Sequence, residues 1–420
     1  RKLTLLSHAK DFQGNKIDVN SDEYLKLLEE IMDVDETVRY FAAHSWLVQL
    51  DDMFVVMRNM GLYIDRNGRS MMLPWDYDLS FGCYYPSMAE TTANMHIDLM
   101  YRADWIAFSD QPRTKETLDY TRFPFFQVIY QNEALMEKYH HYMKDCSKIA
   151  ALGGRTTDGN TYEPCRFVSS ITEMEDSLLR AADQKLAENI YYLNNTEQPR
   201  DARAALPNLK RIIALRALGV VLQVDGMEAV VSGYGCNLET LGNAVQGMNS
   251  FRGRIAAIDE DTGVYSVADY ESSRSDNSPS LRLREMESGE LMYQKIMKQA
   301  GGGAADLKVY TLMDTARASG DYTLYFPADS KEFAGIQEIY SYDGSGSLKK
   351  LEVKKEEDRY CVAAASIDYL VLKGAGGTAE GKAAAVSVKW IVPVSAGACL
   401  VVAAAVVMIL WRRKKRGKKK

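Results

Sequence analysis

The sequence predicts an α+β protein with a mainly helical N-terminal half, a small all-β module and one C-terminal transmembrane helix. Apolar residues recur with helical spacing before residue 227, short alternating runs fill residues 306–373, and residues 391–410 carry no charge. The 420 residues are 46% hydrophobic, which is enough for two or three domains with sizeable cores. A disordered or collagen-like chain is therefore excluded.

Residues 20–50 predict two helices, because their apolar side chains follow the i, i+3, i+4 spacing of a helix with one buried face. Asn20 is the expected N-cap of the first helix and Asp35 that of the second. The second helix should continue until it delivers the chain to Asp51 and Asp52.

A β-hairpin is expected next. Residues 62–64 and 70–73 have strand character and flank an Asn-Gly pair, which is a strong hairpin signal. Asp76 and Asp78 stand just beyond the second strand. The aromatic residues around the hairpin, Tyr63, Trp75 and Phe81, are expected to pack in the core.

The remaining patterns divide the chain into domains. Residues 125–187 and 206–224 are again helical in pattern, and short β-like runs follow a Gly-rich stretch near residue 302. The expected order is a main domain over 1–227, a connecting region and linker over 228–305, a β module over 306–373, a stalk over 374–389, a transmembrane helix over 390–411 and a basic tail over 412–420.

The uncharged stretch of 20 residues, 391–410, is long enough to span the hydrocarbon core of a bilayer as a helix. Trp390 and Trp411 flank it, where aromatic rings favour the membrane interface. Eight positive charges in residues 412–420 place that tail in the cytoplasm, so the body should be extracytoplasmic.

Charge and cysteine usage exclude further classes of function. The net charge is -6, and without the basic tail the chain has 43 basic and 57 acidic residues, so the body should not bind nucleic acid. The six cysteines form no CxxC pair and the five histidines form no HExxH pattern, so no transition-metal site is expected. Because the chain begins at Arg1 without Met or an apolar run, we expect it to be the C-terminal part of a longer protein.

Five polar residues are candidates for chemistry: Asp51, Asp52, Asn59, Asp76 and Asp78. An Asp after a helix, an Asn a few residues later and an Asp after a hairpin is the layout with which kinases hold Mg²⁺ and activate a hydroxyl. Carboxylate and amide oxygens suit such a hard cation. Spacing alone leaves the alternative of solvated or hairpin-capping aspartates open, because Asn59 follows Asp52 by seven residues rather than the five of the protein-kinase motif.

Two segments carry a family resemblance, DVDETVRYFAAHSWLVQLDDMF at residues 33–54 and NMGLYIDRNGRSMMLPWDYDLSFG at residues 59–82. They resemble the spore coat protein H family, the CotH-like kinases, most specifically in LPWDYDLSFG. Residues 209–226 are similar to the helix that closes the family domain. The likeness covers about residues 1–227 and implies an atypical kinase-like C-lobe with a metal-site hairpin.

The resemblance also implies roles and cofactors. ATP with Mg²⁺ or Mn²⁺ would supply the phosphate, and Asp51 would be the catalytic aspartate, with Asp52 as the alternative if the loop is one residue shorter. Asn59 and Asp76 would match the metal-binding positions, and Asp78 is a further candidate ligand. The ATP-binding lysine and its glycine-rich turn are expected upstream of residue 1.

Three functions compete at this point. The leading one is a membrane-anchored kinase that phosphorylates Ser or Thr of a surface or coat protein and contacts the lipid bilayer through residues 391–410. A second is a catalytically inactive kinase-fold surface protein that binds a partner as a scaffold. A third is a hydrolase of cell-wall glycans, which needs two carboxyl groups about 5 to 10 Å apart.

Overall fold

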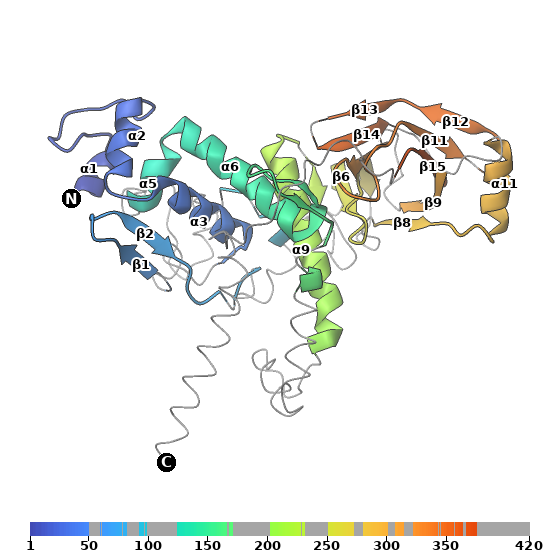
Figure 1. Ribbon diagram of the computed structural model, residues 1–420, viewed down its shortest axis with the longest axis horizontal. Coiled ribbons are helices and arrows are strands. Elements are labelled where there is room, and N and C mark those ends of the chain that lie inside the picture. Colours follow the sequence, from blue (N-terminus) through green and yellow to red (C-terminus); the bar gives the residue numbers. More distant parts are fainter. Residues whose placement is uncertain are drawn as a thin grey trace, which may run out of the picture. The chain divides into compact units, whose positions relative to one another are not determined.

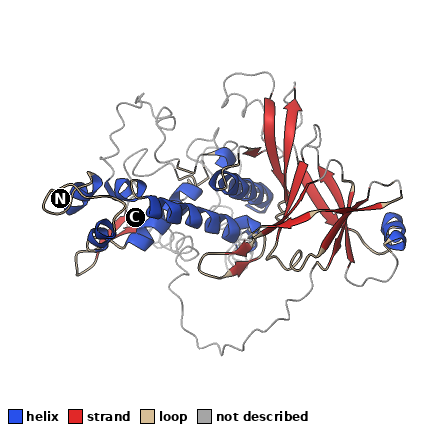
Figure 2. Ribbon diagram, turned by 90° about the horizontal axis from the view of Figure 1, so that it is seen from above, coloured by secondary structure: helices blue, strands red, loops and turns tan. Residues whose placement is uncertain are grey.

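The computed structural model describes two units, each considered by itself. The N-terminal unit comprises residues 1–86 and 98–140, and the C-terminal unit comprises residues 87–97 and 141–379. Helices dominate the first and strands the second (Figures 1 and 2). The residues described are 1–49, 59, 61–77, 79–81, 92–95, 97–98, 124–165, 168–170, 202–227, 229–231, 251–272, 280–300, 307–314, 322–342, 344, 346–356, 358–363 and 367–375.

The N-terminal unit contains helices and one hairpin, as the hydrophobic patterns predict (Figure 1). The pairing of its two strands is antiparallel, with Leu62 opposite Met72. The elements are α1 (Lys2–Ser7), α2 (Asp22–Glu29), α3 (Val34–Trp46), β1 (Gly61–Ile64), β2 (Ser70–Leu73), α5 (Pro124–Tyr130) and α6 (Glu133–Ser147), the last of which runs on into the C-terminal unit.

The two predicted helices before the hairpin are confirmed, but their caps differ from those expected. Ser21 caps α2 and Asp33 caps α3, each accepting a hydrogen bond from the backbone N–H three residues on, at 3.2 and 3.1 Å. The choices of Asn20 and Asp35 were therefore wrong. Apolar spacing determines which face of a helix is buried, whereas the cap is whichever polar residue has extended backbone just before the first turn.

Tyr24 is the polar centre of the N-terminal core. Its side chain is fully buried, and its hydroxyl donates to the carbonyl of Val128 at 3.2 Å. The amide of Gln131 donates both to this hydroxyl at 2.5 Å and to the carbonyl of Leu6 at 2.7 Å. Burial raises the pKa of Tyr24 to about 12, so the phenol stays protonated and joins α1, α2 and α5.

The C-terminal unit contains two β-sheets with the strand orders β13-β14-β10-β7-β6-β5 and β12-β11-β15-β9-β8. All pairs in them are antiparallel except β5 with β6. The strands are β5 (Val230–Val231), β6 (Phe251–Ile258), β7 (Tyr265–Ser272), β8 (Leu281–Glu285), β9 (Leu307–Asp314), β10 (Tyr322–Pro327), β11 (Glu338–Tyr342), β12 (Leu348–Leu351), β13 (Val353–Lys355), β14 (Arg359–Ala363) and β15 (Tyr369–Lys373).

The runs predicted as strands over residues 306–373 are confirmed, but the separate small module is not. β7 pairs with β10 and β8 pairs with β9, so strands from the expected connecting region, 228–305, complete both sheets. The α+β class is confirmed, whereas the mainly helical character expected for the N-terminal half is not supported over the described residues as a whole, because the C-terminal unit consists mainly of strands. In the sequence, Ala256 and Ala257 weaken the alternation of apolar and polar residues in β6. Pairing between strands that are far apart in the chain leaves no local signal.

The predicted helix over residues 206–224 is confirmed as α9 (Ala202–Val224). From Ile213 to Leu222 most of its side chains are buried, and Arg216 is the largest fully buried side chain in the described part of the protein. The remaining elements of this unit are the π-helix η5 (Lys148–Leu152), β3 (Gly154–Arg155), β4 (Thr161–Tyr162) and α11 (Leu291–Gln299).

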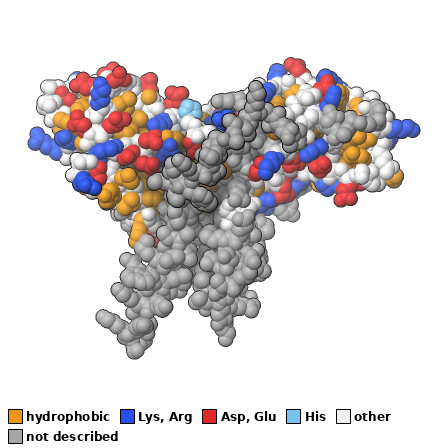
Figure 3. Space-filling model, in the orientation of Figure 1, with side chains coloured by type: hydrophobic (Ala, Val, Ile, Leu, Met, Phe, Trp, Pro, Cys, Tyr) orange, Lys and Arg blue, Asp and Glu red, His pale blue; other side chains and the backbone are white. Residues whose placement is uncertain are grey.

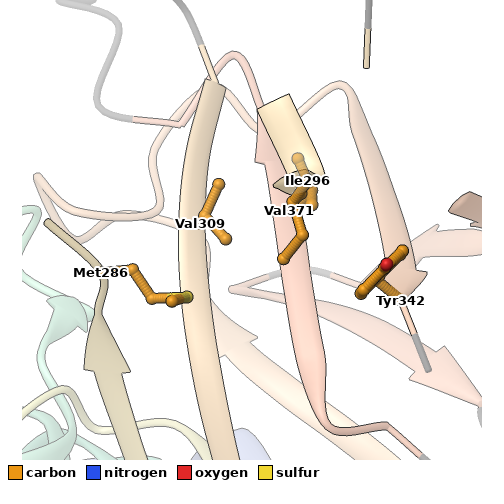
Figure 4. Packing of buried hydrophobic residues seen from close by; sticks show 5 residues of the cluster. All are labelled: Met286, Ile296, Val309, Tyr342 and Val371. Carbon is orange, nitrogen blue, oxygen red and sulfur yellow. The ribbon is translucent and has the colours of Figure 1, made fainter. Parts of the chain in front are cut away.

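α11 covers one end of the five-stranded sheet through a compact apolar cluster. Ile296 is its fully buried contact, and it packs with Val309 and Val371 from adjacent strands, while Met286 and Tyr342 flank them (Figure 4). The helix thus belongs to the folded β region rather than to a linker. Burying such side chains contributes about 1.5 to 3 kcal/mol each.

The predicted transmembrane helix, residues 391–410, lies outside the described residues, as does almost all of the stalk and the whole basic tail. Among the helices that the structure describes, none combines the length and the apolar character needed to cross a bilayer. The membrane anchor therefore stays a prediction.

We expect the C-terminal unit to lose stability in acid partly through Glu338 on β11. Lys350 and Lys373 on the neighbouring strands and the Tyr340 hydroxyl donate to its carboxylate, and they lower its pKa from 4.5 to about 2, with Lys350 as the largest cause. The stabilisation is present above pH 4.5 and is lost as the pH falls towards 2.

Thermal unfolding of the wild type and of Glu338→Gln, measured between pH 7 and pH 2, tests this expectation. The melting temperature of the variant should fall less steeply below pH 4.5 than that of the wild type. Parallel curves for the two proteins would contradict it.

Candidate functional site

The hairpin β1–β2 has its turn stabilised by its own carboxylate. Asp65 accepts hydrogen bonds from the backbone N–H groups of Asn67 at 2.8 Å and Arg69 at 2.9 Å. These bonds, that from Arg69 first, lower the pKa of Asp65. Asp65 is therefore a turn-forming residue, and Gly68 at φ +83° supplies the conformation that the turn requires.

The same hairpin is attached to the junction between α2 and α3. Ser70 donates its backbone N–H to the carbonyl of Ile31 at 2.8 Å, and its hydroxyl reaches the same carbonyl at 3.0 Å. Asp33, the cap of α3, donates its N–H to the carbonyl of Ser70 at 3.0 Å. β2 is thus held at the N-terminal end of α3, which determines where the loop after β2 begins.

The loop after β2 is fastened to the chain that leaves the other end of α3. The side-chain amide of Gln49 donates to the carbonyl of Asp76 at 2.7 Å. The backbone N–H of Phe81 donates to the carbonyl of Leu47 at 2.5 Å, and its ring meets Trp46 edge-on at 5.8 Å between centroids. Asp76 and Phe81 therefore lie against residues 46–49, which come shortly before Asp51 in the sequence.

A third contact joins the loop after β2 to α3 itself. The Tyr77 hydroxyl and His44 Nδ1 share a hydrogen bond of 2.6 Å, and the two rings meet edge-on. His44 is only 2% exposed and stacks on Tyr40 one turn earlier. The buried position makes this histidine part of the support of the loop rather than a solvent-facing ligand.

Backbone conformations with positive φ concentrate around this loop. In the described part of the chain six non-glycine residues have positive φ, and four of them are here: Val48 at 50°, Asn59 at 57°, Asp76 at 61° and Phe81 at 59°. Such conformations are unfavourable for L-residues, most of all for β-branched Val48. Strained backbone of this kind is typical of sites whose geometry the surroundings enforce.

Two of the five candidate residues are described. Asp76 presents an exposed side chain in the loop after β2, and Asn59 is half-buried just before β1. Asp51, Asp52 and Asp78 lie outside the described residues, so their positions stay predictions. The structure does bring Gln49, two positions before Asp51, against the backbone of Asp76.

The donor set fits a hard divalent cation as far as it is described. Asn59 offers an amide oxygen and Asp76 a carboxylate, which are the ligand types that Mg²⁺ and Mn²⁺ accept. Among the described residues no three His, Cys, Asp or Glu side chains cluster as a metal site, and only one of the predicted carboxylates is in that set.

Gln49, His44 and Tyr77 were not singled out from the sequence as site residues. Gln49 matches the helical spacing of the preceding helix, which suggested that it belongs to that helix. α3 instead ends at Trp46, and the chain turns through Val48 before Gln49. The signal that could have indicated this change is the polar character of Gln49 at a position where the pattern calls for a buried side chain.

The hairpin exposes apolar side chains, which the sequence did not lead us to expect. Tyr63 is 52% exposed and Trp75 is 44% exposed, so the expectation that both pack in the core was wrong. Leu62, Ile64 and Leu73 are also exposed, and hydrophobic side chains gather over this part of the unit at the lower left of Figure 3. A two-stranded ribbon has too few neighbours to cover both of its faces.

The comparison with known families agrees with the resemblance in the hairpin and its surroundings. A family model described as CotH kinase protein matches residues 8–150, which include α2, α3, the hairpin and the loop with Asp76. No curated protein matches the chain. Residues 8–150 are therefore similar to the CotH kinase family, and the hairpin and the loop with Asp76 lie within the matched segment.

Proposed function

We propose that the protein is a membrane-anchored CotH-like kinase that transfers the γ-phosphate of ATP to Ser or Thr of a surface or coat protein. The family match over residues 8–150 supports the kinase-like part of this proposal. The protein substrate, the acceptor residue and the anchor are proposals from the sequence. The basic tail and the uncharged stretch 391–410 support the anchor and an extracytoplasmic body.

One observation carries the proposal furthest. The hydrogen bond of 2.7 Å from Gln49 to the carbonyl of Asp76 holds the segment that enters Asp51 against the loop that contains Asp76. Phosphotransfer needs a base and a metal-binding carboxylate near the same phosphate, contributed by separate segments of the chain. The fastening of these two segments supports that requirement.

The proposed roles follow from the chemistry of each side chain. Asp51, or Asp52, accepts the proton of the attacking Ser or Thr hydroxyl. The oxygen of that hydroxyl forms the new bond to the γ-phosphorus of ATP, and the bond from the γ-phosphorus to ADP breaks. Asn59 and Asp76, with Asp78 as a further candidate, would hold Mg²⁺ or Mn²⁺. A bound cation would offset the negative charge that develops on the phosphate oxygens.

We expect the full-length protein to label itself or a Ser-rich substrate with γ-labelled ATP and Mn²⁺ or Mg²⁺. Asp51→Ala and Asp52→Ala are compared separately, and the variant that removes the base should lose about 10²- to 10⁴-fold in rate.

Asp22→Ala is the matched control, since Asp22 is an exposed aspartate in the first turn of α2. Its rate should stay close to that of the wild type. Absence of labelling by the wild type would favour the inactive scaffold, and release of sugars from cell-wall glycan without nucleotide would favour the hydrolase.

A further inference from the structure

Gln49 has an unusual position for a long polar side chain. It is only 1% exposed, it lies outside α3, and it follows Val48, whose φ of 50° is strained for a β-branched residue. Its amide nitrogen donates to the carbonyl of Asp76 at 2.7 Å. The chain therefore accepts an unfavourable turn at Val48 and directs the next side chain at the backbone of a proposed metal ligand.

The amide oxygen of Gln49 indicates which interaction this residue provides. Gln49 Oε1 is buried, and no described residue donates a hydrogen bond to it. A buried acceptor without a donor is unfavourable, and methionine would fill a similar volume without that cost. The feature that glutamine adds at this position is the hydrogen bond to Asp76.

The bond acts on the backbone of Asp76 and does not involve its carboxylate. Asp76 has φ 61°, a conformation that few aspartates adopt, and its side chain is exposed. Holding the carbonyl in place constrains the peptide plane after Asp76, and with it the direction of the side chain that leaves the same Cα. Gln49 thus connects the orientation of the Asp76 carboxylate to the segment that leads into Asp51.

We propose that Gln49 is a positioning residue that sets the direction of the Asp76 carboxylate for metal binding and phosphotransfer. This inference rests on the proposed function, because it assigns to Gln49 a part in the site of that reaction. Gln49 itself need not touch the nucleotide or the acceptor. It acts through the hydrogen bond to the backbone of Asp76.

Three variants of the full-length protein separate positioning from a general structural role. Gln49→Met keeps the side-chain volume but removes the hydrogen-bond donor. Gln49→His replaces the amide donor with a ring N–H at a similar distance from the backbone. Gln131→Met is the matched control, because the Gln131 amide also donates to a backbone carbonyl, that of Leu6 at 2.7 Å, in the same unit.

The measurements are Mn²⁺ affinity by calorimetry, kcat and KM for labelling, and the melting temperature. We expect Gln49→Met to weaken Mn²⁺ binding and to lower kcat by about 10- to 100-fold, as loss of a residue that orients a ligand does. KM for the protein substrate should stay the same. Gln49→His should recover most of both losses, and Gln131→Met should change neither by more than about twofold.

The outcomes distinguish this inference from the proposed function. If the wild type binds Mn²⁺ but does not transfer phosphate, the proposed function fails, and weaker Mn²⁺ binding by Gln49→Met still supports positioning. If the wild type labels its substrate and Gln49→Met matches it in kcat and Mn²⁺ affinity, positioning is overturned while the function stands. A wild type that binds no Mn²⁺ overturns both.

Discussion

Replacing Asp76 by asparagine should lower phosphotransfer on the order of 10³-fold, because a neutral amide replaces the carboxylate that balances charge at the metal and the phosphates. The fold should be almost unaffected. The Asp76 side chain is exposed, and the bond that holds this residue goes from Gln49 to its carbonyl, which the substitution retains. Asparagine also tolerates the left-handed conformation at φ 61°.

Labelling rates and melting temperatures of the wild type, Asp76→Asn and the control Asp22→Asn test this expectation. The melting temperature of Asp76→Asn should stay within about 2 °C of the wild type. Labelling at the wild-type rate by Asp76→Asn would falsify the assignment of Asp76 as a metal ligand.

Replacing Gly219 by alanine should destabilise the C-terminal unit by about 3 kcal/mol or more. A Cβ atom at Gly219 would lie 1.9 Å from the carbonyl oxygen of Ala93 and 3.0 Å from its carbonyl carbon. Both are backbone atoms, so no side chain can rotate away to make room. Either the segment with Ala93 or α9 must move.

That movement is costly because the two residues that follow Ala93 are hydrogen-bonded to α9 and to β5. Arg216 donates to the carbonyl of Met95 at 2.5 Å, and Gln223 donates to the same carbonyl at 3.0 Å. The Asn94 side chain exchanges two hydrogen bonds of 2.9 Å with the backbone of Val231. Moving Ala93 away from α9 would strain or break these bonds.

Thermal or urea unfolding of Gly219→Ala against the wild type measures the effect, which corresponds to a fall of about 6 to 12 °C in the melting temperature. Gly289→Ala is the control in the same unit, because a Cβ there meets no atom within 4 Å and the residue has no positive φ. Equal stability of the two variants would show that α9 and the Ala93 segment separate easily.

Local sequence signals predicted most of the elements around the candidate site. The helical spacing over residues 20–50 and the Asn-Gly turn gave α2, α3 and the hairpin, since each depends on residues close together in the chain. The end of α3 was predicted too late. Helical spacing continues through Gln49 in the sequence, but α3 ends at Trp46 and the Gln49 side chain donates to the carbonyl of Asp76, a contact that the sequence does not show.

In the C-terminal unit, too, the local elements were predicted but the contacts between them were not. Each run over residues 306–373 was recognised as a strand from its own alternation, but one of the two partners of β9 and one of the two partners of β10 come from residues 265–285. Pairing depends on which faces meet in the folded chain, and strands far apart in the sequence carry no mark of their partner. The connecting region predicted over 228–305 was therefore too long.

By itself the sequence determined the α+β class, α2, α3 and the hairpin of the N-terminal unit, the individual strands over residues 306–373 and the resemblance to CotH kinases, because all of these follow from local patterns or from short motifs. Only the tertiary structure decided the caps, the strand order of the two large sheets, the exposure of Trp75 and the bond from Gln49 to Asp76. These depend on which groups meet after folding, when buried polar groups must find partners wherever the chain brings them.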